Sequence, residues 1–341
     1  MRIKDIARMA GVAPSTVSRV LNNSGYISAE IREKVEAVVR ETGYVPNRIA
    51  QSLKRQSTRT IGIIIPQIAS ETMSRLVEAA YGCCNRRGYR ILLENTQLDS
   101  RKELDCLKSL YHQQVEGILL MSTGLTAEHR EIIQSLDLPV IVTGQYMDGL
   151  CCYTHDNRQA AREMVLRMAQ KGRRRIALLN VSLEEDNSIK IQRELGYRDA
   201  LAAAGLSFDE SLTAYGAFTI DAGREMMKAL WENCHPRPDA VFAVTDKIAI
   251  GAMEYLAQKG VSVPGDCMVA GVGNNKLSEF IRPPLSTIEF FYDELGSAVT
   301  DRLLDAVESG EPVEGVHLMR HRIIERESTN GNHTDSGGTA D

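Results

Sequence analysis

Residues 3–54 read IKDIARMAGVAPSTVSRVLNNSGYISAEIREKVEAVVRETGYVPNRIAQSLK. Apolar residues recur at helical spacing over 3–10, and Gly11 supplies a tight turn after them. Pro14 stands where a second helix would begin, a position that tolerates its missing N–H group. Ser28 is suited to cap a third helix, which Gly43 would end. This pattern predicts three short helices around a small apolar centre.

The predicted second helix has two different faces. Val17, Val20 and Leu21 form an apolar stripe, while the opposite face carries short polar side chains and Arg19. Such a face is most often simply solvated, but the turn glycine, the helix spacing and the basic charge favour a helix that lies in the major groove of DNA.

Charge is distributed unevenly along the 341 residues. Residues 1–59 contain 11 Lys/Arg and 5 Asp/Glu, a net charge of +6, and the remainder contains 29 Lys/Arg and 40 Asp/Glu, a net charge of −11. A basic head on an acidic body fits a nucleic-acid contact at one end, although chance clustering in a small module gives the same numbers.

The segment IKDIARMAGVAPSTVSRVLN resembles the headpiece of the lactose/galactose repressor family of bacterial regulators. The likeness is specific over residues 3–54 and continues more weakly to about residue 327. It implies an α/β fold in which a helix-turn-helix headpiece precedes a two-lobed body with parallel sheets, like the periplasmic sugar-binding proteins. Within the family, the overall pattern is more similar to repressors of disaccharide uptake and breakdown, of the sucrose or trehalose type.

The resemblance also assigns the DNA contacts. Pro14, Ser15 and Arg19 take base-reading positions, and Arg19 has the chemistry for a bidentate contact with guanine. Thr16, Ser18 and Asn22 match positions that hold phosphates. The following hinge matches a helix that becomes ordered only over the operator, and Leu53 matches a leucine that inserts between base pairs in the minor groove. The DNA-contacting residues that the resemblance assigns to this hinge are Asn47, Ala50, Leu53 and Lys54. A plain linker with an incidental leucine is the alternative.

From Thr60 onward the hydrophobic pattern changes to alternating strands and helices. Apolar runs predict strands at 61–66, 89–96, 115–122, 139–144, 174–180, 239–245 and 267–273. Amphipathic stretches predict helices at 70–87, 101–114, 127–136, 157–171, 188–204, 221–233 and 246–259. Strands that alternate with helices favour a parallel sheet covered on both faces.

The resemblance divides the chain into four parts. These are a helix-turn-helix domain over 1–45, a hinge and linker over 46–59, an effector-binding and dimerisation domain over 60–327, and a disordered tail over 328–341. The first lobe takes about 60–157 and 288–317, and the second about 158–287 and 318–327. Segments 286–296 and 316–326 are expected to carry the chain between the lobes.

Ligands of such sheets bind at the carboxyl ends of the strands. The residues that the resemblance places there are Gln145, Arg193, Phe218, Asp246 and Tyr292. Each has an ordinary structural alternative: Arg193 as a surface residue, the two aromatic residues as core, and Asp246 as a helix cap. Gly273 stands where the lactose and purine repressors carry an acidic residue, so Asn274 is expected to take over that contact.

Other classes of function find little support. GVGNNK at 271–276 lacks the third glycine of a dinucleotide loop, and the seven histidines are too scattered to suggest a metal site or a catalytic group. No cofactor and no metal is therefore expected. A sugar-binding protein or an enzyme without a transcriptional role is the alternative, which requires discarding the match over 3–54.

The expected partners follow from the same resemblance. They are a pseudo-palindromic double-stranded DNA operator, a small sugar or sugar phosphate effector and a second copy of the chain in a homodimer, without a membrane partner. The seven cysteines include no C-x-x-C pair and are read as reduced packing residues. The expected location is the bacterial cytoplasm, in association with the nucleoid.

Overall fold

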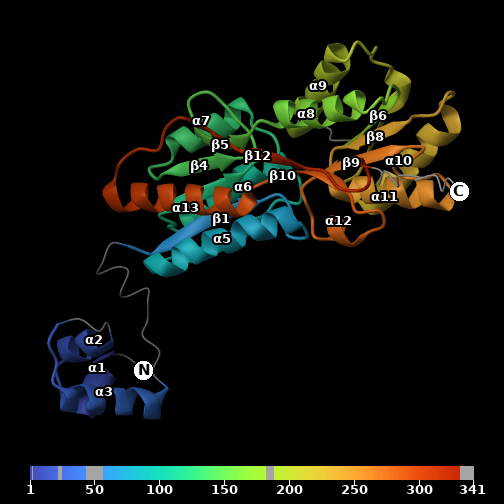
Figure 1. The fold of residues 1–341 in the computed structure, drawn as a ribbon. Coiled ribbons are helices and arrows are strands. Elements are labelled where there is room, and N and C mark those ends of the chain that lie inside the picture. Colours follow the sequence, from blue (N-terminus) through green and yellow to red (C-terminus); the bar gives the residue numbers. More distant parts are fainter. Residues whose placement is uncertain (2, 22–24, 44–56, 182–187, 331–341) are drawn as a thin grey trace, which may run out of the picture. The chain divides into compact units, whose positions relative to one another are not determined.

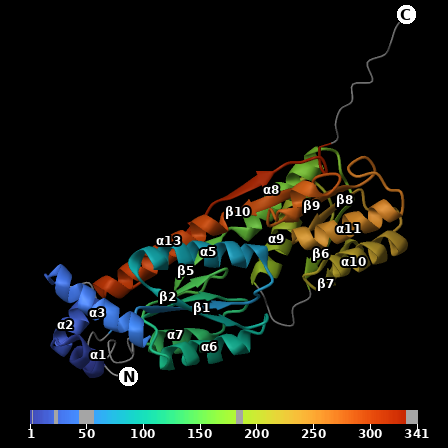
Figure 2. The same ribbon diagram turned by 90° about the horizontal axis from the view of Figure 1, so that it is seen from below.

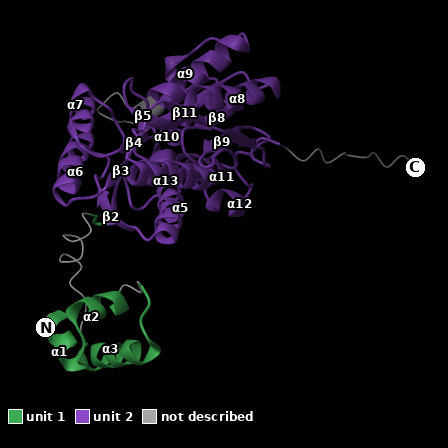
Figure 3. Ribbon diagram, turned by 90° about the vertical axis from the view of Figure 1, so that its left-hand side faces the viewer, with its two compact units in different colours: residues 1–58 green, residues 59–341 purple. Residues whose placement is uncertain are grey.

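The computed structural model describes residues 1, 3–21, 25–43, 57–181 and 188–330. The chain forms two compact units, Met1–Thr58 and Arg59–Asp341, which Figure 3 colours separately. Each unit has its own hydrophobic core. The predicted hinge residues Asn47, Ala50, Leu53 and Lys54, and Asn22 before them, lie outside the described residues.

The first unit contains the three predicted helices, α1 (Ile3–Ala10), α2 (Pro14–Leu21) and α3 (Ala29–Thr42). Ile6, Val17 and Val35 are fully buried at its centre. Gly11 and Gly43 adopt positive φ angles of 64° and 61°, the left-handed conformation that glycine adopts without strain. The Ser28 hydroxyl accepts a hydrogen bond from the Ile31 N–H at 3.4 Å, so the predicted cap of the third helix is confirmed.

The second unit is built on two six-stranded sheets. The first has the strand order β11-β5-β4-β3-β1-β2. Its strands are β1 (Thr60–Ile65), β2 (Arg90–Asn95), β3 (Gly117–Met121), β4 (Val140–Thr143), β5 (Cys151–His155) and β11 (Val316–Met319). All its neighbouring strands are parallel. The strands predicted at 61–66, 89–96, 115–122 and 139–144 are confirmed, whereas β5 and β11 were not predicted as strands.

Helices cover both faces of the first sheet (Figure 2). α5 (Glu71–Arg87) and α13 (Tyr292–Ser309) pack side by side on one face, where Leu76 and Leu303 are buried. α6 (Ser100–His112) and α7 (Ala127–Ser135) cover the other face. Consecutive apolar residues of β1 therefore alternate between two cores, which explains why the strand reads as an unbroken apolar run.

The second sheet has the order β12-β10-β9-β8-β6-β7. Its strands are β6 (Ile176–Val181), β7 (Thr213–Gly216), β8 (Ala240–Ala243), β9 (Met268–Val272), β10 (Ser286–Phe290) and β12 (His321–Ile324). Only β12 is antiparallel to its neighbour among the described pairs. The helices α8 (Asn157–Gln170) and α9 (Ser188–Ala203) form one pair, and α10 (Ile220–Asn233) and α11 (Asp246–Gln258) the other (Figure 1). A single-turn helix, α12 (Leu277–Phe280), and a 3₁₀ turn at Glu210–Leu212 complete this lobe.

The chain passes between the lobes slightly later than predicted. Strand β10 pairs with β9, so residues up to Phe290 belong to the second sheet, and the predicted boundary near 288 cuts this strand. The return occurs between β11, at the edge of the first sheet, and β12, at the edge of the second. Segments 286–296 and 316–326 do carry the crossings, because each contains the last residues of one lobe and the first of the other.

The predicted start of the tail at 328 is wrong. Ser328 and Thr329 are buried, and the Ser328 hydroxyl donates to the carbonyl of Val269 at 2.6 Å while accepting from the Ser286 N–H at 2.8 Å. These hydrogen bonds hold Ser328 against β9 and β10. The polar composition of the segment does not show that its first residues are bound in this way. Residues 331–341 lie outside the described residues.

The cysteines are free thiols and six of the seven are buried, as the sequence predicted for packing residues. Burial raises the pKa of Cys84 to about 11 and of Cys267 to about 12. Among the described residues, no helix is both long and apolar enough to cross a bilayer.

Candidate functional site

In the first unit, the face of α2 that points away from the core is accessible to a binding partner. Val17 and Val20 point into the core, whereas Pro14, Ser15 and Arg19 are exposed and Thr16 and Ser18 are partly exposed. This separation follows from the helical period, which puts residues three and four apart on the same side. The structure therefore places these five predicted DNA contacts on the accessible side of one helix.

The second unit contains a cavity of about 180 Å³ between its two lobes. The lining comes from the carboxyl ends of strands in both sheets and from the helices that follow them, the expected place for a ligand. Its polar lining residues are Gln67, Ser70, Glu71, Thr72, Ser122, Thr123, Thr143, His155, Asn157, Arg193, Thr245, Lys247 and Asn275. Its aromatic lining residues are Phe218, Phe290 and Tyr292.

Arg193 is a buried residue of the cavity wall and not a surface residue. Its Nε donates to Asn157 Oδ1 at 2.9 Å, and one Nη donates to the carbonyl of Val244. The guanidinium carbon lies 5.5 Å from the centre of the Phe290 ring. Burial lowers the pKa of Arg193 by penalising its charged form. A guanidinium has five N–H donors, so others remain for a ligand.

Phe218 and Tyr292 both line the cavity, as the sequence predicted, and both also pack against the core of the second lobe. The two alternatives for these residues are thus compatible, because each side chain both packs against the core and lines the cavity. Burial raises the pKa of the Tyr292 phenol, with Arg193 acting in the opposite direction. Aromatic faces suit the apolar C–H edges of a sugar ring.

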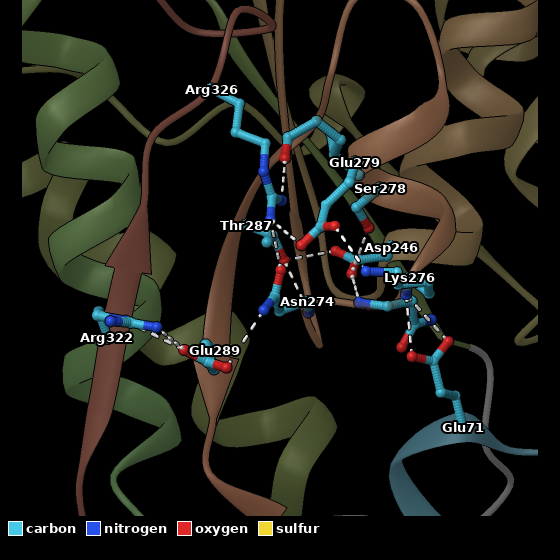
Figure 4. Close-up of polar contacts among 12 residues, drawn as sticks. Glu71, Asp246, Asn274, Lys276, Ser278, Glu279, Thr287, Glu289, Arg322 and Arg326 are labelled. Atoms are coloured by element: carbon cyan, nitrogen blue, oxygen red, sulfur yellow. Dashed lines mark hydrogen bonds and ion pairs between the residues drawn. The ribbon is translucent and has the colours of Figure 1, made fainter.

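Asp246 does not line the cavity. Its carboxylate is fully buried and accepts hydrogen bonds from the Thr287 hydroxyl at 2.5 Å, the Ser278 hydroxyl at 2.8 Å and the Asn275 N–H at 2.7 Å (Figure 4). The cap of α11 is the neighbouring Thr245, whose hydroxyl accepts from Ile248 N–H. Both interpretations of Asp246 from the sequence are therefore wrong: it fastens the loop after β9 from behind.

Asn274 also points away from the cavity. Its side chain donates to Glu289 and accepts from Arg326, at 3.2 and 2.8 Å (Figure 4). Asn275 lines the cavity instead. Gly273 has a φ angle of 131°, which side-chain-bearing residues rarely adopt, so the local backbone favours glycine at this position. The expectation that Asn274 replaces the missing acidic residue is not supported.

Gln145 lies behind the cavity wall. Its Oε1 accepts from the Leu125 N–H at 3.2 Å, and its buried Nε2 has no hydrogen-bond partner among the described residues. The adjacent Gly144 is the residue that lines the cavity. A contact between Gln145 and an effector therefore requires a rearrangement of this turn.

Several lining residues were not predicted. His155 is the last residue of β5, and Asn157 is the first residue of α8. The end of a strand directly before a helix would have indicated a site here, but β5 itself was not predicted. Burial, followed by the nearby Arg193 charge, lowers the pKa of His155 to about 3, so its imidazole is neutral at pH 7. The hydroxyls of Ser122 and Thr123 are oriented from behind by the buried carboxylate of Glu103, at 2.7 and 2.9 Å.

Two contacts between described residues join the lobes at the rim of the cavity. The Lys276 N–H, in the loop after β9, donates to the Glu71 carboxylate at the start of α5, with distances of 2.9 and 3.1 Å (Figure 4). Lys247 Nζ donates to the carbonyl of Ala69 at 3.3 Å. Glu71 and Lys247 also line the cavity, so a ligand bound there would contact residues that hold the two lobes together.

A helix-turn-helix head joined to a two-lobed body with an inter-lobe cavity defines a ligand-responsive DNA-binding regulator. The family model for bacterial regulatory proteins of the lacI family matches residues 2–47, and that for a periplasmic binding protein-like domain matches 165–329. The chain belongs to the lacI family of bacterial regulatory proteins.

Relatives with established names agree with this assignment. The chain is 32% identical to the sucrose operon repressor of Staphylococcus xylosus over 95% of each chain, and 35% identical to the ribose operon repressor of Escherichia coli K12 over 89% of this chain and 92% of the relative. Among solved structures, a lac repressor dimer bound to operator matches 96% of this chain and 99% of its own at 25% identity, with a TM-score of 0.84. The predicted family, fold and transcriptional role are confirmed, and the relatives are regulators and not enzymes.

Proposed function

We propose that this protein is a dimeric repressor of a carbohydrate-utilisation operon whose affinity for operator DNA is set by a small sugar or sugar phosphate in the inter-lobe cavity. The observation that carries the proposal is the buried guanidinium of Arg193 in a cavity of aromatic and hydroxyl-bearing side chains. The sucrose, ribose and lac repressors among its relatives support a carbohydrate-responsive role.

The head reads a pseudo-palindrome as a pair of copies. Pro14, Ser15 and Arg19 take the base-reading positions of α2, and Arg19 makes a bidentate contact with guanine. Thr16, Ser18 and Asn22 hold phosphates of the DNA backbone. The hinge residues from Asn47 to Lys54 place Leu53 in the minor groove, so Leu53→Ala is expected to weaken operator binding while ligand binding is retained. The protein acts in the cytoplasm at the nucleoid.

Ligand binding biases the arrangement of the two lobes, because the cavity walls belong to both sheets. The rim contacts between Glu71 and Lys276 and between Lys247 and Ala69 would form or break with this rearrangement. A coupling free energy of ~1–3 kcal/mol between the two sites would change operator affinity about 5–150-fold.

Arg193→Ala is the variant that tests this proposal. We expect it to bind operator with the affinity of the unliganded wild type, because Arg193 lies in the second unit, and to lose the response to ligand. Fluorescence anisotropy with a labelled palindromic promoter fragment measures both properties. A variant that keeps the full ligand response would refute the role assigned to Arg193.

A further inference from the structure

We propose that the ligand of the cavity is anionic: a sugar derivative whose carboxylate or phosphate group is held by Arg193 and Lys247. This inference rests on the proposed function and narrows its ligand class. Its basis is the balance of charge on the cavity wall, where the buried Arg193 and the partly buried Lys247 both lack a directly paired carboxylate among the described residues.

Arg193 is the deeper of the two cations. It is 6% exposed, and both of its hydrogen bonds go to neutral oxygens, one on Asn157 and one on the backbone at Val244. No carboxylate pairs with it among the residues that the structure describes. Asp246 acts on Arg193 only through space, raising its pKa against the effect of burial. A buried charge without a directly paired counter-charge is costly, so a ligand that brings an anion to this site offsets a penalty already present in the unliganded protein.

Lys247 also lines the cavity, in the first turn of α11 and in the same lobe as Arg193. The positive end of the helix dipole lies in that turn, so a lysine there is electrostatically unfavourable without an anion nearby. Its ammonium contacts only a neutral carbonyl, that of Ala69 at 3.3 Å, and forms no ion pair with any described residue. The bond to Ala69 across the lobes requires a donor but not a charge, whereas an anionic ligand would account for the charge.

The nearby carboxylates do not pair directly with these two cations. Glu71 is the acidic side chain of the lining, and both its oxygens face the Lys276 N–H at the rim (Figure 4). The oxygens of Asp246 are taken by Thr287, Ser278 and the Asn275 N–H. Gly273 contributes no side chain, and His155 is neutral. The described wall thus presents two cations and one peripheral carboxylate.

A neutral sugar is recognised differently, through carboxylates that accept hydrogen bonds from several hydroxyl groups. In this cavity the only lining carboxylate is engaged by a backbone amide, within the part of the chain that the structure describes. Hydroxyl and aromatic side chains remain to hold a sugar ring, and the cations are positioned for a charged substituent. The combination favours a charged sugar over its neutral counterpart.

The first experiment uses inorganic phosphate and full-length protein. Thermal unfolding is measured in phosphate and in chloride at equal ionic strength, for the wild type, Lys247→Met and a control, Lys228→Met, whose lysine is exposed on α10. We expect phosphate to raise the melting temperature of the wild type and the control more than that of Lys247→Met. An equal rise in all three proteins would be general salt stabilisation and would contradict the proposal.

The second experiment separates the sources of the charge. Calorimetric titrations compare glucose with gluconate and glucose 6-phosphate, and sucrose with sucrose 6-phosphate. We expect at least one charged sugar to bind about tenfold or more tightly than its neutral counterpart, and Lys247→Met to reduce that ratio about tenfold. Tighter binding by gluconate assigns a carboxylate, and tighter binding by a phosphorylated sugar assigns a phosphate.

The outcomes distinguish this inference from the function on which it rests. If a neutral sugar binds as tightly as its charged counterparts and changes operator affinity, the inference fails while the proposed function stands. The inference is also overturned if Lys247→Met leaves the ratio of charged-sugar to neutral-sugar affinity unchanged. It is overturned as well if no charged sugar binds and the effect of phosphate on the melting temperature does not depend on Lys247. If no sugar of either kind changes operator affinity, the proposed function itself is contradicted.

Discussion

Single residues show where a family pattern transfers to this chain and where it does not. Arg193, Phe218 and Tyr292 lie in the cavity as the family resemblance predicted. Only Arg193 follows a strand that the apolar pattern located, β6, whereas Phe218 and Tyr292 follow β7 and β10, which that pattern did not reveal. Asp246 and Asn274 follow strands too, yet their side chains turn into the protein. The direction of a side chain depends on the polar partners behind it, here Thr287, Ser278 and Arg326, and such partners are distant in sequence.

The role of Asp246 as a loop anchor is tested by Asp246→Ala. Removing the carboxylate leaves two hydroxyls and a backbone N–H without their acceptor, so we expect the free energy of unfolding to fall by at least about 2 kcal/mol without any ligand. Asp221→Ala is the matched control, since Asp221 lies in the first turn of α10 and is exposed. Denaturant unfolding measures both. Unchanged stability of Asp246→Ala would argue for a direct ligand role instead.

His155 makes the body sensitive to acid. Its pKa is about 3 in the folded protein, below the ordinary value of 6.5, so the unfolded chain binds more protons between these values. Stability contributed by the neutral imidazole is therefore complete above pH 6.5 and is lost as the pH falls towards 3, by about 2 kcal/mol at about pH 5. His155→Gln should unfold with a weaker dependence on pH over this window. Parallel pH profiles for the two proteins would contradict this assignment.

At the scale of elements, the sequence predicted the long and strongly patterned segments. The buried strands β1, β3 and β9 read as apolar runs, and the helices between them are amphipathic. Strands β5 and β7 were missed because CCYTH and TAYG are short and carry polar residues. Their place in the sheets is fixed by pairing with β4 and β6, which is tertiary information.

The close packing of α10 against α11 gives a prediction for this level. A Cβ atom at Gly251 would lie 1.9 Å from the carbonyl oxygen of Ile220, so the helices would have to separate. We expect Gly251→Ala to lower the free energy of unfolding by about 3 kcal/mol or more. Gly82→Ala in α5 is the control, because its Cβ would meet nothing closer than 3.6 Å and is expected to be neutral or slightly stabilising. Thermal unfolding of the two variants compares them directly, and equal melting temperatures would refute the packing argument.

For the whole molecule, the division into a DNA-binding head and a ligand-binding body was the property that the sequence predicted best. The basic head and the acidic body are visible in the charge distribution, and the change from a three-helix pattern to alternating strands marks their boundary. The inter-lobe contacts of Glu71 and Lys247 were not predictable, since they join residues about two hundred positions apart along the chain. These contacts appear only when both sheets are folded together.

The central claim is that the cavity controls the grip of the head on DNA. The most direct test is the affinity of full-length protein for its promoter palindrome and for random duplex of equal length, at one fixed salt concentration, with and without a ligand found to bind the cavity. We expect the palindrome to be preferred, the ligand to change that affinity about fivefold or more, and Arg193→Ala to abolish the change. Equal affinity for both duplexes, or an operator affinity that bound ligand leaves unchanged, would contradict the claim.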